Sequence, residues 1–108
     1  MVVEFTGRQS EIGPAERAIA ERKLAKLEKE LHGITHVHVV TSVDRHLHRA
    51  EVTVHFGHFD LAAMEESPDP AVSMAEAFDK LERQALHHLG RLRERKGGAA
   101  VPEAEPEA

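Results

Sequence analysis

The sequence contains no cysteine, tryptophan or tyrosine, and only four phenylalanines among its 108 residues. The lack of cysteine excludes a disulfide scaffold and a thiolate zinc site. No apolar run approaches the ~20 residues that span a bilayer, and the N-terminus lacks the charged and apolar segments of a secretion signal. At 41% apolar residues, the chain is expected to form one soluble, cytoplasmic domain with an aliphatic core.

Motifs for catalysis or metal binding are also missing. No serine lies in a nucleophile motif, and Gly97-Gly98 precedes a polar tail rather than the helix that a phosphate loop needs. Among nine histidines, His36, His38 and His55 could converge on one face of a sheet, as a three-histidine zinc site requires. We favour ordinary surface histidines, and we predict no enzymatic activity, no cofactor and no metal.

Hydrophobic periodicity predicts six elements in the order β-α-β-β-β-α. Alternating apolar and polar residues predict four strands, at residues 2–7, 34–44, 48–57 and, more weakly, 58–64. Apolar residues three and four apart predict two helices, from Pro14 to about Gly33 and from about Ala71 to Arg95. Each helix has one apolar face, so the economical packing is an α+β fold with both helices on one face of a four-stranded mixed sheet.

The packing predicts a core and a boundary. The side chains expected to be buried are Phe5, Ile19, Leu24, Leu27, Val37, Val39, Val52, Val54, Phe78 and Leu81. The folded domain should span residues 1–96. Residues 97–108, rich in Glu, Pro and Ala, cannot bury enough apolar surface to fold and are expected to form a disordered acidic tail.

Positive charge is concentrated in the two predicted helices, although the formal net charge is −5. Residues 17–29 hold five Lys or Arg against two Glu, and residues 80–96 hold six against two, whereas residues 51–79 hold seven acids and no Lys or Arg. A local field of this kind attracts a polyanion whatever the mean charge. The candidate RNA-binding residues are Arg22, Lys23, Lys26, Lys29, Lys80, Arg83, His87, Arg91 and Arg95.

The alternative interpretation of these cations is a solvated helix face with intrahelical pairs, such as Lys26 with Glu30 and Lys80 with Glu82. We expect the two rows instead to form one continuous strip on helices packed side by side. His87 and His88 are expected to lie in that strip, so RNA binding should strengthen as falling pH protonates them.

Four segments also carry a resemblance to a known family. They are Gly7-Arg8 with Ile12 and Pro14, Arg22-Lys23-Leu24-Ala25-Lys26-Leu27-Glu28-Lys29, His48-Arg49-Ala50-Glu51-Val52-Thr53-Val54, and Asp79-Lys80-Leu81-Glu82-Arg83-Gln84. In this order they resemble the ribosome hibernation-promoting factor and ribosome-associated inhibitor family, also called sigma modulation proteins, over roughly residues 1–96.

The resemblance implies a cytoplasmic bacterial or plastid protein that is not an enzyme. Members bind the small ribosomal subunit in the channel for messenger and transfer RNA, and silence idle ribosomes through basic residues of two parallel helices and neighbouring loops. We expect a short member, monomeric when free and without the dimerising second domain of long members. Whether it pairs ribosomes is left open, as is the role of the tail. The second hypothesis is a divergent protein-interaction module that kept the fold and lost ribosome affinity.

Overall fold

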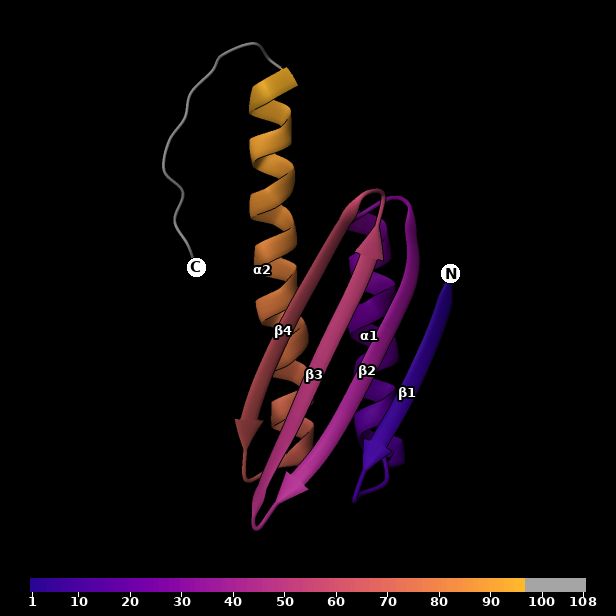
Figure 1. Cartoon of the computed structure of the whole chain (residues 1–108), viewed down its shortest axis with the longest axis vertical. Coiled ribbons are helices and arrows are strands. Elements are labelled where there is room, and N and C mark those ends of the chain that lie inside the picture. The colour runs from indigo at the N-terminus through magenta and orange to yellow at the C-terminus, as the bar shows by residue number, and fades with distance from the viewer. Residues whose placement is uncertain (97–108) are drawn as a thin grey trace.

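Six elements follow one another along the chain in the predicted order (Figure 1). A computed structural model describes residues 1–96, with side chains described for residues 1–90. The elements are β1 (Val2–Arg8), α1 (Pro14–Glu30), β2 (Ile34–Asp44), β3 (Leu47–Phe56), β4 (Phe59–Ser67) and α2 (Pro70–Lys96). The predicted tail, residues 97–108, lies outside the described residues.

The four strands form one mixed sheet in the order β1-β2-β3-β4. β1 runs parallel to β2, with Val3 opposite Val37, because α1 carries the chain back between them. β2, β3 and β4 form the predicted antiparallel meander, joined by short turns. At the β3–β4 turn the backbone of Gly57 has a φ of +59°, a conformation that glycine adopts without steric cost.

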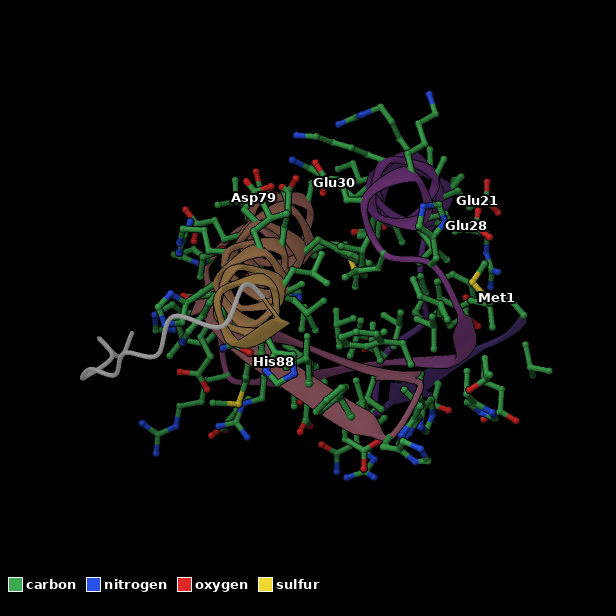
Figure 2. The ribbon with its side chains drawn as sticks, turned by 90° about the horizontal axis from the view of Figure 1, so that it is seen from above. Met1, Glu21, Glu28, Glu30, Asp79 and His88 are labelled. Atoms are coloured by element: carbon green, nitrogen blue, oxygen red, sulfur yellow. The ribbon has the colours of Figure 1, made fainter. Side chains whose placement is uncertain are left out.

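Both helices cover the same face of the sheet, as predicted (Figures 1 and 2). From the sheet, alternate residues of β2 and β3 enter the core, among them Val37, Val39, Val52 and Val54. Each helix contributes one apolar stripe: Ala20, Leu24 and Leu27 from α1, continued by Leu31 just after it, and Met74, Phe78, Leu81 and Ala85 from α2. None of the described helices is both long and apolar enough to cross a membrane.

Two of the ten predicted core residues are only partly buried. Phe5 lies on β1, the edge strand of the sheet, and the Arg17 guanidinium lies 4.2 Å from the centre of its ring. Ile19 lies beside the buried Ala20, off the α1 stripe, and is half-buried against the core. The other eight are buried as predicted.

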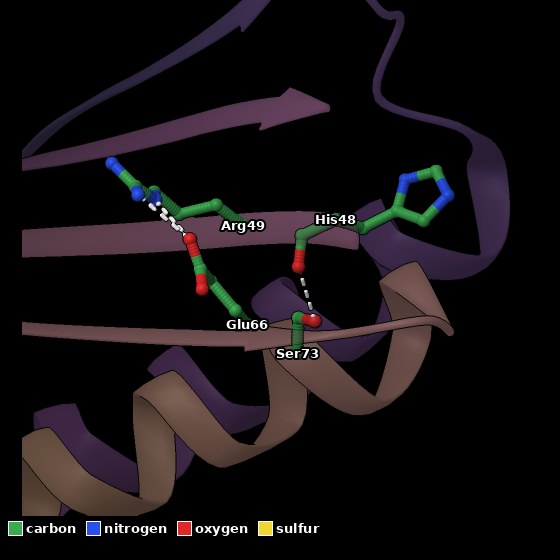
Figure 3. Close-up of polar contacts among 4 residues, drawn as sticks. All are labelled: His48, Arg49, Glu66 and Ser73. Atoms are coloured by element: carbon green, nitrogen blue, oxygen red, sulfur yellow. Dashed lines mark hydrogen bonds and ion pairs between the residues drawn. The ribbon is translucent and has the colours of Figure 1, made fainter. Parts of the chain in front are cut away.

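Element boundaries differ from the sequence prediction most at the ends of β4 and α1, and elsewhere by one residue at most. β4 extends to Ser67 rather than ending near Met64, because its pairing with β3 continues through Arg49 opposite Glu66. The Arg49 guanidinium donates two hydrogen bonds to Oε2 of Glu66, at 2.9 and 2.7 Å (Figure 3). α1 ends at Glu30, before the predicted limit. α2 begins at Pro70, one residue before the predicted start.

A hydrogen bond from Ser73 joins the first turns of α2 to the sheet. Asp69 caps the helix, since its Oδ1 accepts a hydrogen bond from the backbone N–H of Ala71 at 2.9 Å. One turn on, the buried Ser73 hydroxyl lies 2.7 Å from the carbonyl oxygen of His48 on β3 (Figure 3). This contact fixes α2 against β3 and thereby helps to set its direction alongside α1.

Candidate nucleic-acid interface

The polar face of α1 is divided between cations and acids. Arg22, Lys26 and Lys29 lie four and three residues apart, opposite the buried leucine stripe, and all three are exposed. Glu21 and Glu28 lie on the side of α1 that is turned away from α2 (Figure 2). The side of α1 that faces away from the sheet, where these three cations lie, is therefore positive.

Two ion pairs cross between the helices. Nζ of Lys23 lies 2.6 Å from Oδ1 of Asp79, and Nζ of Lys26 lies 3.3 Å from Oε2 of Glu82. Both partners advance by three residues, so α1 and α2 run parallel along this line of contact, which we call the helix seam. The two lysines are thus held by α2, and the ion pair of Lys26 is with Glu82 rather than with Glu30, its partner in the intrahelical alternative.

Glu30 completes the helix seam. Its pKa is raised above the ordinary value, first by a hydrogen bond shared with the Glu82 carboxyl, then by burial and by the negative charge of Glu82, while Lys26 opposes the rise. Figure 2 shows Glu30 pointing into the space between the helices, on the side away from the sheet. The seam therefore carries three acids beside two lysines.

The cations of α2 lie on different flanks of that helix. Nζ of Lys80 lies 3.5 Å from Oε2 of Glu65 on β4, on the flank opposite the seam, and so does not pair with Glu82 as the intrahelical alternative supposed. Arg83 is exposed. Within residues 1–90, no ion pair engages Arg22, Lys29 or Arg83.

The two histidines of α2 do not share one surface. His87 is exposed, on the polar side of the helix. His88 lies on the sheet side, with its ring centre 4.1 Å from that of Phe59 and 6.2 Å from that of Phe56 (Figure 2). The expectation that His88 belongs to the RNA-facing strip was therefore wrong, because adjacent helical residues point about 100° apart.

The last two candidate cations lie near the end of α2. Arg91 and Arg95 belong to the helix, which continues beyond the ends of the strands (Figure 1). Their side chains lie outside the described residues. Their role in binding stays a prediction.

The resulting surface has exposed cations on both helices, separated by a seam whose lysines are paired with acids. Arg22 and Lys29 on α1 and Arg83 on α2 are exposed cations, and guanidinium and ammonium groups are the usual partners of phosphate. The sequence prediction missed Asp79 and Glu65 as partners of its candidate lysines, and considered Glu82 only for Lys80 rather than for Lys26. The sequence did hold a signal for the seam pairs: Lys23 and Lys26 are three residues apart, as are Asp79 and Glu82, which is the spacing that two parallel helices need for two successive ion pairs.

On the opposite, open sheet face, the rings of His36 and His55 meet edge to face with their centres 5.8 Å apart, and each histidine also has a partner on a neighbouring strand. Nε2 of His36 lies 3.3 Å from Oε1 of Glu4, and Nδ1 of His55 lies 2.5 Å from Oδ1 of Asp60. His38 contacts the Thr6 hydroxyl at 3.0 Å. Among the described residues, no three histidine, cysteine or acidic side chains are grouped so that they could hold a metal ion.

Comparison with solved structures shows where this architecture recurs. The N-terminal domain of Protein Y from Thermus thermophilus superposes with a TM-score of 0.70 at 33% identity, over 78% of this chain and 94% of that one. A ribosomal subunit interface protein from Coxiella burnetii gives a TM-score of 0.74 over 83% of this chain and 99% of that one. At 22% identity, the second likeness shows the shared fold alone.

Sequence comparison gives relatives that match over nearly their whole length. The ribosome hibernation promoting factor of Azotobacter vinelandii is 31% identical over 98 residues, which are 91% of this chain and 92% of the relative. The factor of the same name from Escherichia coli K12 is 32% identical over 94 residues, 87% of this chain and 99% of the relative. Residues 3–93 match the family described as sigma 54 modulation protein / S30EA ribosomal protein. The chain belongs to this family, as the four resembling segments indicated.

Proposed function

We propose that this protein is a cytoplasmic, non-enzymatic ribosome hibernation factor. It binds the RNA of the small ribosomal subunit, in the channel for messenger and transfer RNA, and keeps idle ribosomes silent. The proposal is supported by relatives named for ribosome hibernation that it matches over 87–91% of its length. The single structural observation that carries it is the exposure of cations on both helices of one layer.

Those cations define the binding surface. Arg22 and Lys29 are one turn to either side of Lys26, and Lys26 reaches across to α2, so both helices present charge to the same solvent region. Arg83 directly follows Glu82, the partner of Lys26, and extends this surface onto α2. The other three candidate lysines are already paired: Lys23 with Asp79, Lys26 with Glu82 and Lys80 with Glu65. Their charge contributes to RNA binding only as far as phosphate competes with these acids.

A pair of matched variants tests the proposal. Lys29→Gln with Arg83→Gln removes two exposed helix cations, and Arg8→Gln with Arg45→Gln removes two exposed cations outside the helices that form no ion pair within residues 1–90. Both doubles change the net charge equally. Cosedimentation with purified small ribosomal subunits should weaken at least about tenfold for the helix double, and its log–log salt slope should fall by about 0.7–0.9 for each phosphate that the variant no longer neutralises.

The control double should bind nearly as the parent protein does. Equal binding by both doubles, with both proteins folded, would remove the helix surface from the interface. Failure of the parent protein to bind the subunit at low salt would favour the alternative, an interaction module without ribosome affinity. The neutralised seam is the observation that gives this alternative weight, because paired lysines attract phosphate less strongly.

A further inference from the structure

Two carboxyl groups meet at the helix seam with too few donors between them. Oε1 of Glu30 is buried, and no hydrogen-bond donor among the described residues reaches it. Its neighbour Glu82 is bound on Oε2 by Lys26 at 3.3 Å. A buried carboxylate oxygen without a donor is costly, and a second carboxylate beside it raises that cost.

The surroundings offer Glu30 little other compensation. On α1, the nearest cation is Lys26, which is shared with Glu82. Farther along the seam, Lys23 is held by Asp79 at 2.6 Å. On α2, Arg83 and His87 lie after Glu82 and are exposed to solvent. Beneath the seam, the sheet presents apolar side chains, among them Val37, Val39, Val52 and Val54.

The position of Glu30 in its helix also disfavours the ionised form of its carboxyl group. It is the last residue of α1, where the helix dipole places partial negative charge. An anion at this end of a helix is disfavoured, whereas a neutral carboxyl group is not. A proton held between the two carboxyls supplies the missing donor and removes one negative charge from the seam.

We propose that Glu30 and Glu82 form a proton-binding pair that sets the charge of the helix surface, so that this surface binds polyanions more tightly as pH falls. This inference rests on the proposed function for its biological ligand. The raised pKa of Glu30, caused first by its hydrogen bond with Glu82, is the behaviour expected of such a pair.

The charge arithmetic explains the direction of the effect. With the proton bound, the seam holds two ionised acids, Asp79 and Glu82, beside Lys23 and Lys26. When the proton leaves, Glu30 adds one negative charge between α1 and α2, close to the surface on which phosphate is expected to bind. By linkage, phosphate binding must in turn increase the affinity of the pair for its proton.

The test uses heparin, whose sulfate groups stay ionised from pH 5 to pH 8, so that any pH dependence comes from the protein. At pH 8 and constant ionic strength, calorimetry should show that Glu30→Gln binds heparin more tightly than the parent protein does, because the variant lacks the negative charge of ionised Glu30. The difference between the two should shrink as pH falls to 5, whereas protonation of the nine histidines, which both proteins share, raises both affinities. Carbon-13 NMR of the side-chain carboxyls should show Glu30 titrating above its usual range in the free protein.

Two control variants separate the pair from other titrating groups. Glu28→Gln makes the same chemical change on the side of α1 turned away from α2, and should keep the parent's pH dependence (Figure 2). His87→Gln should lower the pH dependence of both the parent protein and Glu30→Gln, and leave the difference between them unchanged. Equal affinities of Glu30→Gln and the parent protein at pH 8, or a difference between them that persists at pH 5, would overturn the proposal.

The outcome is distinguishable from failure of the proposed function. If small ribosomal subunits fail to bind at any pH while heparin binding keeps its Glu30-dependent slope, the hibernation proposal is wrong and the proton-binding pair stands. If subunits bind but Glu30→Gln and the parent protein bind heparin equally at every pH, the pair is wrong and the hibernation proposal stands.

Discussion

Nζ of Lys23 on α1 lies 2.6 Å from Oδ1 of Asp79 on α2, across a separation of 56 residues in the chain. The lysine side chain is only 23% exposed, and the aspartate side chain is 44% exposed. The pair therefore lies partly out of solvent, where a charge pair is screened less than at an open surface. Its position at the helix seam indicates a structural role in addition to any contact with RNA.

The first prediction concerns this pair. A double-mutant cycle of Lys23→Met and Asp79→Asn should give a coupling free energy of about 0.5–1 kcal/mol in chemical denaturation, the upper range for exposed pairs. Lys29→Met serves as the control, because Lys29 is exposed and forms no ion pair with residues 1–90. A coupling of zero would show that the two charges meet without stabilising the helix pair.

The second prediction concerns the fastening of α2 to the sheet. Ser73 is 1% exposed, and its hydroxyl lies 2.7 Å from the carbonyl oxygen of His48 and 2.8 Å from the Ser67 hydroxyl. Ser73→Ala should lower the free energy of unfolding by about 1–3 kcal/mol, because it leaves a buried carbonyl short of its donor.

The comparison for Ser73 is Ser42→Ala on β2. Ser42 is half-exposed and makes no side-chain hydrogen bond within residues 1–90, so its replacement should change stability by less than about 0.5 kcal/mol. Urea denaturation measures both variants. Equal effects would mean that the hydroxyl of Ser73 adds nothing to the attachment of α2.

The third prediction concerns the apolar stripe of α2. Leu81 is fully buried between the helices and the sheet, whereas Leu86, five residues later, is 45% exposed. Leu81→Ala should lower the free energy of unfolding by about 2–5 kcal/mol, through reduced apolar burial and a residual cavity. Leu86→Ala, the same substitution on the same helix, should lower it by less than about 1 kcal/mol. Similar losses would contradict the orientation of α2.

The sequence was sufficient for the fold because its patterns are local. In residues 48–57, Ala50, Val52 and Val54 alternate with polar residues, and this period of two defines which face of β3 is buried. The meander follows from short connections, which antiparallel neighbours allow. The length of β4 was underestimated because pairing with β3, rather than the polar Glu65 and Glu66 themselves, maintains the strand to Ser67.

The site was predicted less completely, because charge partners depend on tertiary position. The cations of α1 could be assigned to its solvent side from helical spacing alone. Which acids hold Lys23, Lys26 and Lys80 depends on how α1, α2 and β4 lie beside one another. The orientation of His88 depends on the rotation of α2 about its axis, which brings that ring onto Phe59.

The fourth prediction concerns the stability of the protein as a function of pH. The pKa of Glu30 is raised in the folded state, chiefly by its hydrogen bond with Glu82, so the folded protein holds this proton more tightly than the unfolded chain does. The stabilisation from the proton is fully present below the unfolded pKa, and is lost as pH rises through the folded pKa.

Glu30→Gln removes this titration while keeping a side-chain amide that can donate to Glu82. The variant should therefore melt at a higher temperature than the parent protein at pH 8, and the difference should shrink as pH falls towards 4. Calorimetric melting curves at constant ionic strength measure this difference in melting temperature. Glu28→Gln should leave the pH dependence of the parent unchanged. If Glu30→Gln instead melts below the parent at pH 8, attraction between ionised Glu30 and Lys26 outweighs repulsion from Glu82, and the pair does not hold a proton.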